Sequence, residues 1–335
     1  MKKITVVVST WRRPEILNFV LIALARQSLP MSEFEVIVVD SNSGDETPVV
    51  VRSAQIVGLD VRLVHSDVNS VSAKRNKGIT LAQGRYIAFL DDDCVPLEDH
   101  LEVFLRFAES SAGARIIWCG GVRFSNELVR ESNYYKYRDG CHYSSFKKLP
   151  ERLGFQNIVT MNMFVERTLI EKDKLFFDER FVGYGFEDLE FGFRAERTGY
   201  QLLPCTADIE HMEPLGSISK FSNKFFHAAR DGMPVYLAAT DHAVNSLGQS
   251  FWLEPSPPDE QASSKIKRRF VHCLLDSPLP RIIGLILGYV DRFPFVYSKL
   301  LYRFVLAGAY RAGVRARLKG EGISVDRANR DGWYS

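Results

Sequence analysis

Three consecutive carboxylates, Asp91, Asp92 and Asp93, follow a short apolar run at residues 86–90. A run of this length, bounded by glycine and polar residues, is typical of a buried β-strand. After Pro96, apolar residues recur at helical spacing and predict a helix. In open α/β sheets, ligands bind at the carboxyl ends of the strands, and closely spaced carboxylates suit Mg²⁺ or Mn²⁺. The alternative is a solvated turn before the helix.

A second acidic pair, Glu187 and Asp188, follows the glycine-containing run at residues 183–186. The glycines permit a tight turn, and the acids begin a predicted helix that ends at Gly199. Acids at a helix N-terminus are favoured by the helix dipole, so simple capping is one interpretation and catalysis the other. His211 follows further along the chain, and a lone histidine is more often structural than a metal ligand.

The elements around these residues alternate between strand and helix. The sequence predicts buried strands at residues 4–8, 34–39 and 61–65, with helices between them. This alternation indicates right-handed βαβ units and a parallel sheet. The ends of the first two strands, at Ser9 and Asp40, would then face the same edge as Asp91.

A basic pair, Lys74 and Arg75, lies near the start of a helix predicted from about Ser72 to Gly84. Cations in this position either contact phosphate or form a solvated surface. The first turn carries no G-x-G-x-x-G and the chain no G-x-x-x-x-G-K-[ST]. Neither a dinucleotide cofactor nor a P-loop NTPase is therefore indicated.

Four segments, in order, resemble the motifs of family-2 glycosyltransferases with the GT-A fold. Residues 9–14 (STWRRP) resemble their P-T-Y-N-R opening, and residues 38–45 (VVDSNSGD) resemble V-V-D-D-G-S-x-D. Residues 73–78 (AKRNKG) resemble the A-R-N-x-G helix, and residues 90–93 (LDDD) match the L-D-x-D metal motif. Together the four segments cover roughly the first hundred residues.

The resemblance implies a GT-A fold, with a Rossmann-like, mostly parallel sheet flanked by helices, and a donor site at its edge. Ser9, Arg12 and Ser41 depart from the family pattern, whereas Trp11 keeps its aromatic character. Asp93 is the implied ligand of Mn²⁺ or Mg²⁺. The residues implied to bind the nucleotide sugar are Ser9, Trp11, Arg13, Asp40, Lys74, Arg75, Asp91 and Asp92.

Residues 183–188 (GYGFED) resemble the G-W-G-x-E-D signature of β-1,4-galactosyltransferases and several bacterial family-2 polymerases. In those enzymes the acidic pair binds the acceptor, and one member is the general base. The resemblance assigns the base to Asp188, and the acceptor or a donor hydroxyl to Glu187. A histidine after the base helix completes the metal site in that group, which favours His211 as the second ligand beside Asp93.

The implied reaction is metal-dependent, inverting transfer of a sugar from a nucleoside-diphosphate sugar. Family precedent favours a UDP-sugar, a saccharide or lipid-linked acceptor hydroxyl, and cell-surface polysaccharide synthesis. A sugar nucleotidyltransferase is a rival, although the first strand is followed by no glycine-rich, arginine-containing loop. A non-catalytic carbohydrate-binding or assembly subunit is another, although all the expected acids are present.

Residues 125–155 break the alternation of strands and helices and predict an irregular segment over the site. Its aromatic side chains either contact a sugar acceptor or form a packed cluster. These side chains, with one histidine, are Tyr134, Tyr135, Tyr137, His142, Tyr143 and Phe146.

The composition is that of an ordinary globular protein, with 335 residues, 46% hydrophobic and 25% charged. Five cysteines without C-x-x-C spacing, and no secretory signal, favour a reducing cytoplasm. The net charge of +2 conceals an asymmetry. Residues 265–319 hold twelve Lys/Arg and two Asp, a balance of +10, which leaves −8 for the remainder.

These patterns predict a catalytic domain at 1–250, a Pro/Ser-rich linker at 251–264, a basic helical appendage at 265–320 and a loose tail at 321–335. The appendage lacks the ~18–20 uninterrupted apolar residues of a spanning helix. Its basic and apolar residues suit either an anionic membrane surface on the inner face of the cell membrane or a cap on the catalytic domain. Packing against a second subunit of a homo-oligomer is a third alternative. Nucleic acid is not expected, because no binding module accompanies the charge.

Overall fold

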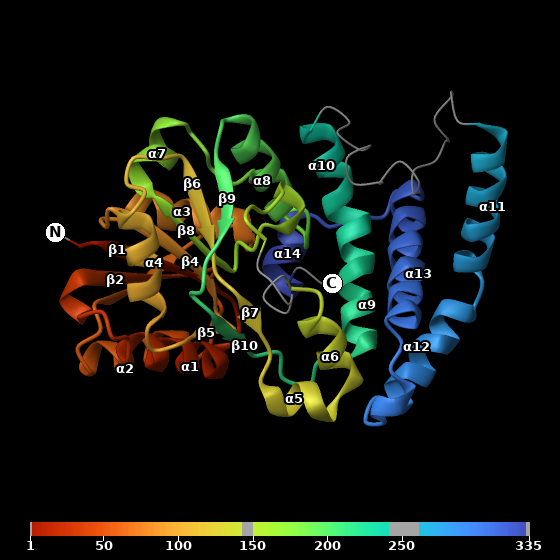
Figure 1. Ribbon diagram of the computed structural model, residues 1–335, viewed down its shortest axis with the longest axis horizontal. Coiled ribbons are helices and arrows are strands. Elements are labelled where there is room, and N and C mark those ends of the chain that lie inside the picture. The colour runs from red at the N-terminus through yellow and green to blue at the C-terminus, as the bar shows by residue number, and fades with distance from the viewer. Residues whose placement is uncertain (1, 143–149, 241–260, 333–335) are drawn as a thin grey trace. The chain divides into compact units, whose positions relative to one another are not determined.

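The computed structural model describes residues 2–142, 150–240 and 261–332 (Figure 1). The chain divides into two compact units. The first comprises Met1–Ser125, Asp139–Glu179 and Phe191–Pro214, and the second comprises Asn126–Arg138, Arg180–Glu190 and Leu215–Ser335. The predicted linker lies largely outside the described residues, and a helix already begins at Ala262.

A seven-stranded sheet, in the order β3-β2-β1-β4-β8-β6-β9, forms the centre of the first unit. Every neighbouring pair is parallel except the pairs of β8, which runs antiparallel to β4 and β6. All residues of β1 and β2 are buried, as expected for apolar strands covered on both faces. The predicted α/β fold with a mostly parallel sheet is confirmed. The strands are β1 Ile4–Thr10, β2 Phe34–Asp40, β3 Val61–His65, β4 Tyr86–Asp91, β6 Ile116–Cys119, β8 Asn162–Glu166 and β9 Gln201–Pro204.

Helices flank this sheet and begin where the sequence supplies a start signal. Pro14 opens α1, and Ser70 caps α3 by accepting a hydrogen bond from the Ala73 N–H. The α3 helix packs closely on β1, since a Cβ on Gly78 would lie 2.3 Å from Cγ1 of Val7. The helices are α1 Pro14–Ala25, α2 Thr47–Ile56, α3 Val71–Leu81, α4 His100–Glu109, α7 Arg167–Lys172 and α8 Glu187–Arg197, which begins in the second unit.

A second, small sheet in the first unit was not predicted. Its strands are β5 Cys94–Pro96, β10 Ile209–His211 and β7 Val122–Arg123, in the order β5-β10-β7. The antiparallel pairing of β10 with β5 sets His211 opposite Cys94. Because Cys94–Pro96 is a strand, the helix expected after Pro96 begins later, at His100.

The described part of the second unit is helical. Its longest helix, α13 (Lys299–Leu318), packs against α9, α11 and α12 and a π-helical segment, Ala228–Gly232. The loose tail predicted after residue 320 contains a helix, α14 (Val325–Asp331). The other helices are α5 Asn126–Glu131, α6 Asn133–Asp139, α9 Ile218–His227, α10 Met233–Ala239, α11 Ala262–Asp276 and α12 Leu279–Tyr289.

The irregular segment expected at 125–155 is wrong for its first part, which forms α5 and α6. Tyr134, Tyr135 and Tyr137 are buried in the second unit. Tyr137 stacks on Tyr302 with 4.8 Å between ring centroids, so these tyrosines form a packed cluster. Tyr143 and Phe146 lie outside the described residues.

No single helix among the described residues is both long and apolar enough to cross a membrane. Within the described ranges, α11 and α12 taken together, bent by 54° at their junction, meet that length and composition.

Candidate active site

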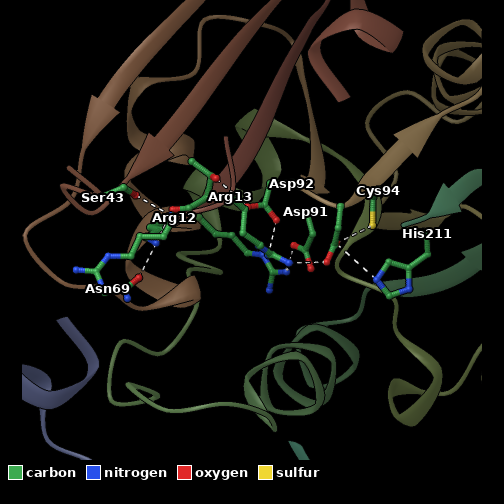
Figure 2. A network of polar contacts seen from close by, with 12 residues as sticks. Arg12, Arg13, Ser43, Asn69, Asp91, Asp92, Cys94 and His211 are labelled. Atoms are coloured by element: carbon green, nitrogen blue, oxygen red, sulfur yellow. Dashed lines mark hydrogen bonds and ion pairs between the residues drawn. The ribbon is translucent and has the colours of Figure 1, made fainter. Parts of the chain in front are cut away.

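The ends of three parallel strands meet at one edge of the large sheet. Thr10 of β1 is paired in register with Asp40 of β2, and Ser9 with Asp91 of β4. The first unit therefore brings together the polar residues that follow these strands, as the sequence predicted (Figure 2).

Arg13 lies between two of the three aspartates. It pairs with Asp92 and places its Nη1 2.8 Å from Oδ2 of Asp93. Asp92 is fully buried and also accepts a hydrogen bond from the Thr10 hydroxyl at 2.7 Å. Burial raises the pKa of Asp92 to about 6, and the Arg13 guanidinium opposes this shift. Arg13 thus joins the end of β1 to the acidic run, and its contact with a nucleotide sugar remains a prediction.

Asp40 organises the turn after β2. Its carboxylate accepts hydrogen bonds from the backbone N–H and the hydroxyl of Ser43, and the N–H bond is 2.8 Å long. The Ser43 hydroxyl in turn accepts from the Arg12 N–H at 2.9 Å, which links this turn to the end of β1. Arg12 adopts a left-handed backbone, φ 53°, and its guanidinium lies 4.4 Å from the centroid of the Trp11 ring.

Ser9 and Trp11 each hold a buried polar atom at this edge. Neither Ser9 Oγ nor Trp11 Nε1 has a hydrogen-bond partner within the described parts of the chain. Such atoms are costly to leave unpaired, so a ligand that contacts them gains specificity. The assignment of both residues to donor binding remains a prediction.

Lys74 lies beneath the edge and is fully buried. Its Nζ donates to the Thr10 carbonyl at 2.8 Å and to Oδ1 of Asn69 at 2.7 Å. Burial lowers the pKa of Lys74 to about 7, against the opposing charges of Asp40 and Asp92. In this position the amine supports the backbone at the end of β1.

Arg75, the neighbour of Lys74, is also buried and points elsewhere. Its Nη2 lies 2.9 Å from Oδ1 of Asp91, and its guanidinium packs 5.2 Å from the centroid of the Phe177 ring. The arginine therefore fixes the first of the three aspartates. Its predicted contact with phosphate remains untested.

Asp93, Cys94 and His211 form a cluster of described residues that could hold a metal ion, with their donor atoms within 4.8 Å of one another. His211 is 4% exposed, its Nε2 lies 3.6 Å from Oδ1 of Asp93, and its Nδ1 has no hydrogen-bond partner in the described residues. Figure 2 shows Cys94 and His211 from two strands of the small sheet, beside the aspartates. Burial raises the pKa of the Cys94 thiol, so it stays neutral. Carboxylate oxygen and imidazole nitrogen fit Mn²⁺ better than this thiol does.

The second acidic pair lies in the second unit, at the start of α8. Gly185 and Phe186 before it both adopt left-handed backbones, with φ 89° and 73°. The loop rests on the π-helical segment, because a Cβ on Gly232 would lie 2.1 Å from the Gly185 carbonyl oxygen. The Phe186 ring packs 5.4 Å from that of Tyr236. These contacts fix the loop and therefore the position at which Glu187 and Asp188 begin α8.

The sequence analysis did not single out three residues that contact the candidate site: Cys94, Thr10 and Asn69. Cys94 follows the aspartates directly, so its adjacency was the available signal. Thr10 and Asn69 act through hydrogen bonds to Asp92 and Lys74, which only the fold brings within reach.

Comparisons with known proteins concern the family and the fold of the chain. The model of the family described as glycosyl transferase family 2 matches residues 5–171. Glycosyltransferase AglE of Haloferax volcanii is 26% identical over 268 residues, which cover 76% of this chain and 82% of that protein. The amylovoran biosynthesis glycosyltransferase AmsB of Erwinia amylovora is 30% identical over 211 residues, which cover 59% of this chain and 65% of that protein.

A solved structure extends the likeness to nearly the whole chain. The mannosyltransferase PcManGT from Pyrobaculum calidifontis, in complex with GDP-Man and Mn²⁺, superposes with a TM-score of 0.55 at 17% identity. The match covers 95% of this chain and 88% of that one. At this level of identity the likeness concerns the fold, which is of the GT-A type.

Proposed function

Since the chain belongs to glycosyl transferase family 2, we propose that it transfers a sugar from a nucleoside-diphosphate sugar to a hydroxyl of a saccharide or lipid-linked acceptor. The observation that carries this proposal is the convergence of Asp40, Asp91, Asp92, Asp93 and His211 at one edge of the first unit. Cell-surface polysaccharide synthesis is the proposed role.

The donor side of the reaction concerns the departing diphosphate. The bond between the anomeric carbon and the diphosphate oxygen breaks through an oxocarbenium-like state, and negative charge gathers on the leaving group. A divalent ion held by Asp93 and His211 would supply positive charge against it. Asp91 would face the ribose or the donor sugar, whereas Asp92, fully buried against Thr10 and Arg13, would act through Arg13. Their fixed partners, Arg75 and Arg13, hold them in place.

The acceptor side needs a base. We assign it to Asp188, which would take the proton of the acceptor hydroxyl as its oxygen bonds to the anomeric carbon. Glu187 would hold the acceptor or a donor hydroxyl. The support is the likeness of residues 183–188 to the galactosyltransferase signature. A single base with in-line attack inverts the anomeric centre, so an α-linked donor gives a β-linked product.

The test is donor hydrolysis, without acceptor, across UDP- and GDP-sugars with Mn²⁺, Mg²⁺ or EDTA. GDP donors belong in the panel because PcManGT was solved with GDP-Man. We expect metal-dependent release from one donor, lost in Asp93→Asn and kept in Glu98→Gln, an exposed acid on the loop before α4. Silence across the panel, with no metal-dependent nucleotide binding by calorimetry, would favour a non-catalytic binding subunit.

Asp188→Asn separates the base from the donor site. Transfer to an acceptor should fall by several orders of magnitude, while calorimetry finds the donor bound with unchanged affinity. Unchanged turnover would rule out Asp188 as the base.

A further inference from the structure

An apolar surface in the second unit faces solvent. More than half of the exposed large apolar side chains of the described residues lie between residues 266 and 301. This many exposed large apolar side chains within one helical segment indicate an interaction site, whereas apolar residues that are exposed singly need no explanation. They are Ile266, Phe270, Leu279, Ile282, Leu285, Ile286, Tyr289, Phe293, Phe295, Val296, Leu300 and Leu301.

The α12 helix shows the pattern most clearly. Leu287 is buried at 3% exposure, whereas Leu285 and Tyr289 are 76% and 85% exposed. The exposed residues recur at positions 279, 282, 285, 286 and 289, which form one stripe of a helix. The helix is therefore apolar on the side that packs against α13 and also on the opposite side, where a helix in water carries polar residues.

Cations border this surface, and its acids are already engaged. Exposed basic residues lie on α11, α12, the following turn and the start of α13. The two acids of residues 265–319 make internal contacts: Asp276 pairs with Arg311 and Arg315, and Asp291 accepts from the Ser132 hydroxyl at 2.6 Å. The exposed charge is therefore positive. The basic residues are Lys267, Arg269, Arg281, Arg292, Lys299 and Arg303.

We propose that this apolar and basic surface, the 266–303 face, docks on an anionic lipid bilayer. Charge complementarity selects this occupant, because two copies of one positive face repel each other, whereas anionic headgroups attract it. The α12 helix has 11 residues and is about 16 Å long, too short for the ~30 Å hydrocarbon core. Tyr289, Phe293 and Phe295 suit the headgroup level, so the helix lies in the interface plane.

The experiment is co-sedimentation of the full chain with vesicles of phosphatidylcholine alone or mixed with phosphatidylglycerol. We expect binding to the mixed vesicles that weakens as salt is raised. Lys267→Gln/Arg269→Gln/Arg292→Gln should weaken it on the order of 100-fold, at about fivefold for each charge. Leu285→Ser/Phe295→Ser should weaken it at least about tenfold. The control Ile56→Ser/Val57→Ser removes equally exposed apolar groups at the end of α2 and should bind like the parent.

The outcomes are separable. Binding is measured without nucleotide sugar, so it does not depend on the proposed reaction, and circular dichroism checks that each variant is folded. Equal sedimentation with and without phosphatidylglycerol, or none with either, would overturn the proposal. A dimer in analytical ultracentrifugation that Leu285→Ser/Phe295→Ser dissociates would assign the face to a second copy. Retention on vesicles after alkaline carbonate would indicate a bent α11–α12 span, against the interfacial placement.

Discussion

Lys74 is a buried cation whose role follows from what it touches. It holds the Thr10 carbonyl and the Asn69 side chain, and Thr10 in turn donates to Asp92. Its pKa, lowered to about 7 by burial, means that the folded chain releases this proton far more readily than the unfolded chain. Between pH 7 and about 10.5, the unfolded state therefore binds more protons, and stability rises with pH.

Lys74→Met should remove this dependence. Urea unfolding of the parent at pH 9.5 should give a free energy on the order of 3 kcal/mol higher, from this group, than at pH 7. The Met variant should gain much less over the same interval. Identical pH dependence in the two proteins would mean that the amine does not titrate in the folded state as its burial indicates.

Most of the acidic edge could be predicted from residues alone, because each acid follows an apolar run that forms a strand. What the sequence did not reveal is which cation faces which acid. Lys74 and Arg75 are adjacent in the chain, yet one reaches Thr10 and the other Asp91. Side-chain direction on a helix separates neighbours by about 100°, so adjacency says little about shared contacts.

At the scale of elements, the loop at residues 183–186 depends on the π-helical segment of the second unit. Gly232 leaves room for the Gly185 carbonyl, and Phe186 packs against Tyr236 and Tyr310. Because α8 begins directly after the loop, with Glu187 and Asp188, a shift of the loop on the π-helical segment moves both acids.

Gly232→Ala should disturb the loop and leave unchanged the proposed donor-binding residues, which belong to the first unit. A Cβ at 2.1 Å from a backbone oxygen forces a displacement, which we expect to cost about 1–3 kcal/mol of stability. The kcat for transfer should fall while donor affinity stays unchanged. Gly288→Ala in α12 is the matched control, because nothing lies within 4 Å of its Cβ. If the two variants had the same stability and the same kcat, the loop would not depend on its packing against Gly232.

The small sheet shows why some elements escape prediction. Its strands are two or three residues long, too short to display a periodicity of two. His211 could be selected from its place in the chain, but its approach to Asp93 depends on the pairing of β10 with β5. Long elements with repeated patterns were predicted well, and the short strands that bring His211 close to Asp93 were not.

At the scale of the molecule, a buried polar network joins the two sheets of the first unit. His100 of α4 contacts Oδ1 of Asn162 at 2.8 Å. The Asn162 amide donates to the carbonyls of Gly121 and Ala207, beside the strands of the small sheet. Burial lowers the pKa of His100 to about 4, so the imidazole remains neutral in the folded chain.

This network predicts acid sensitivity of the whole fold. Between pH 6.5 and 4, His100 binds a proton in the unfolded chain but stays neutral in the folded chain. The free energy of unfolding therefore falls as the pH falls, by about 3 kcal/mol from this group. The raised pKa of Asp92 acts oppositely over pH 3.8–6. Urea unfolding of the parent and of His100→Gln at pH 7 and 4.5 separates the effect of His100 from that of Asp92, because both proteins contain Asp92. The difference between the proteins should shrink at low pH, and a constant difference would exclude His100 as its source.

The π-helical segment has a consequence for rotational phase. It inserts one residue into the run from α9 to α10, which turns everything after it by about 100° relative to an uninterrupted α-helix. In this rotated phase the Tyr236 ring packs 5.4 Å from that of Phe186. Deletion of one residue within Ala228–Gly232 would remove this offset and turn Tyr236 away from Phe186. The irregular segment thus sets the rotation of α10 relative to α9, which a point substitution cannot change.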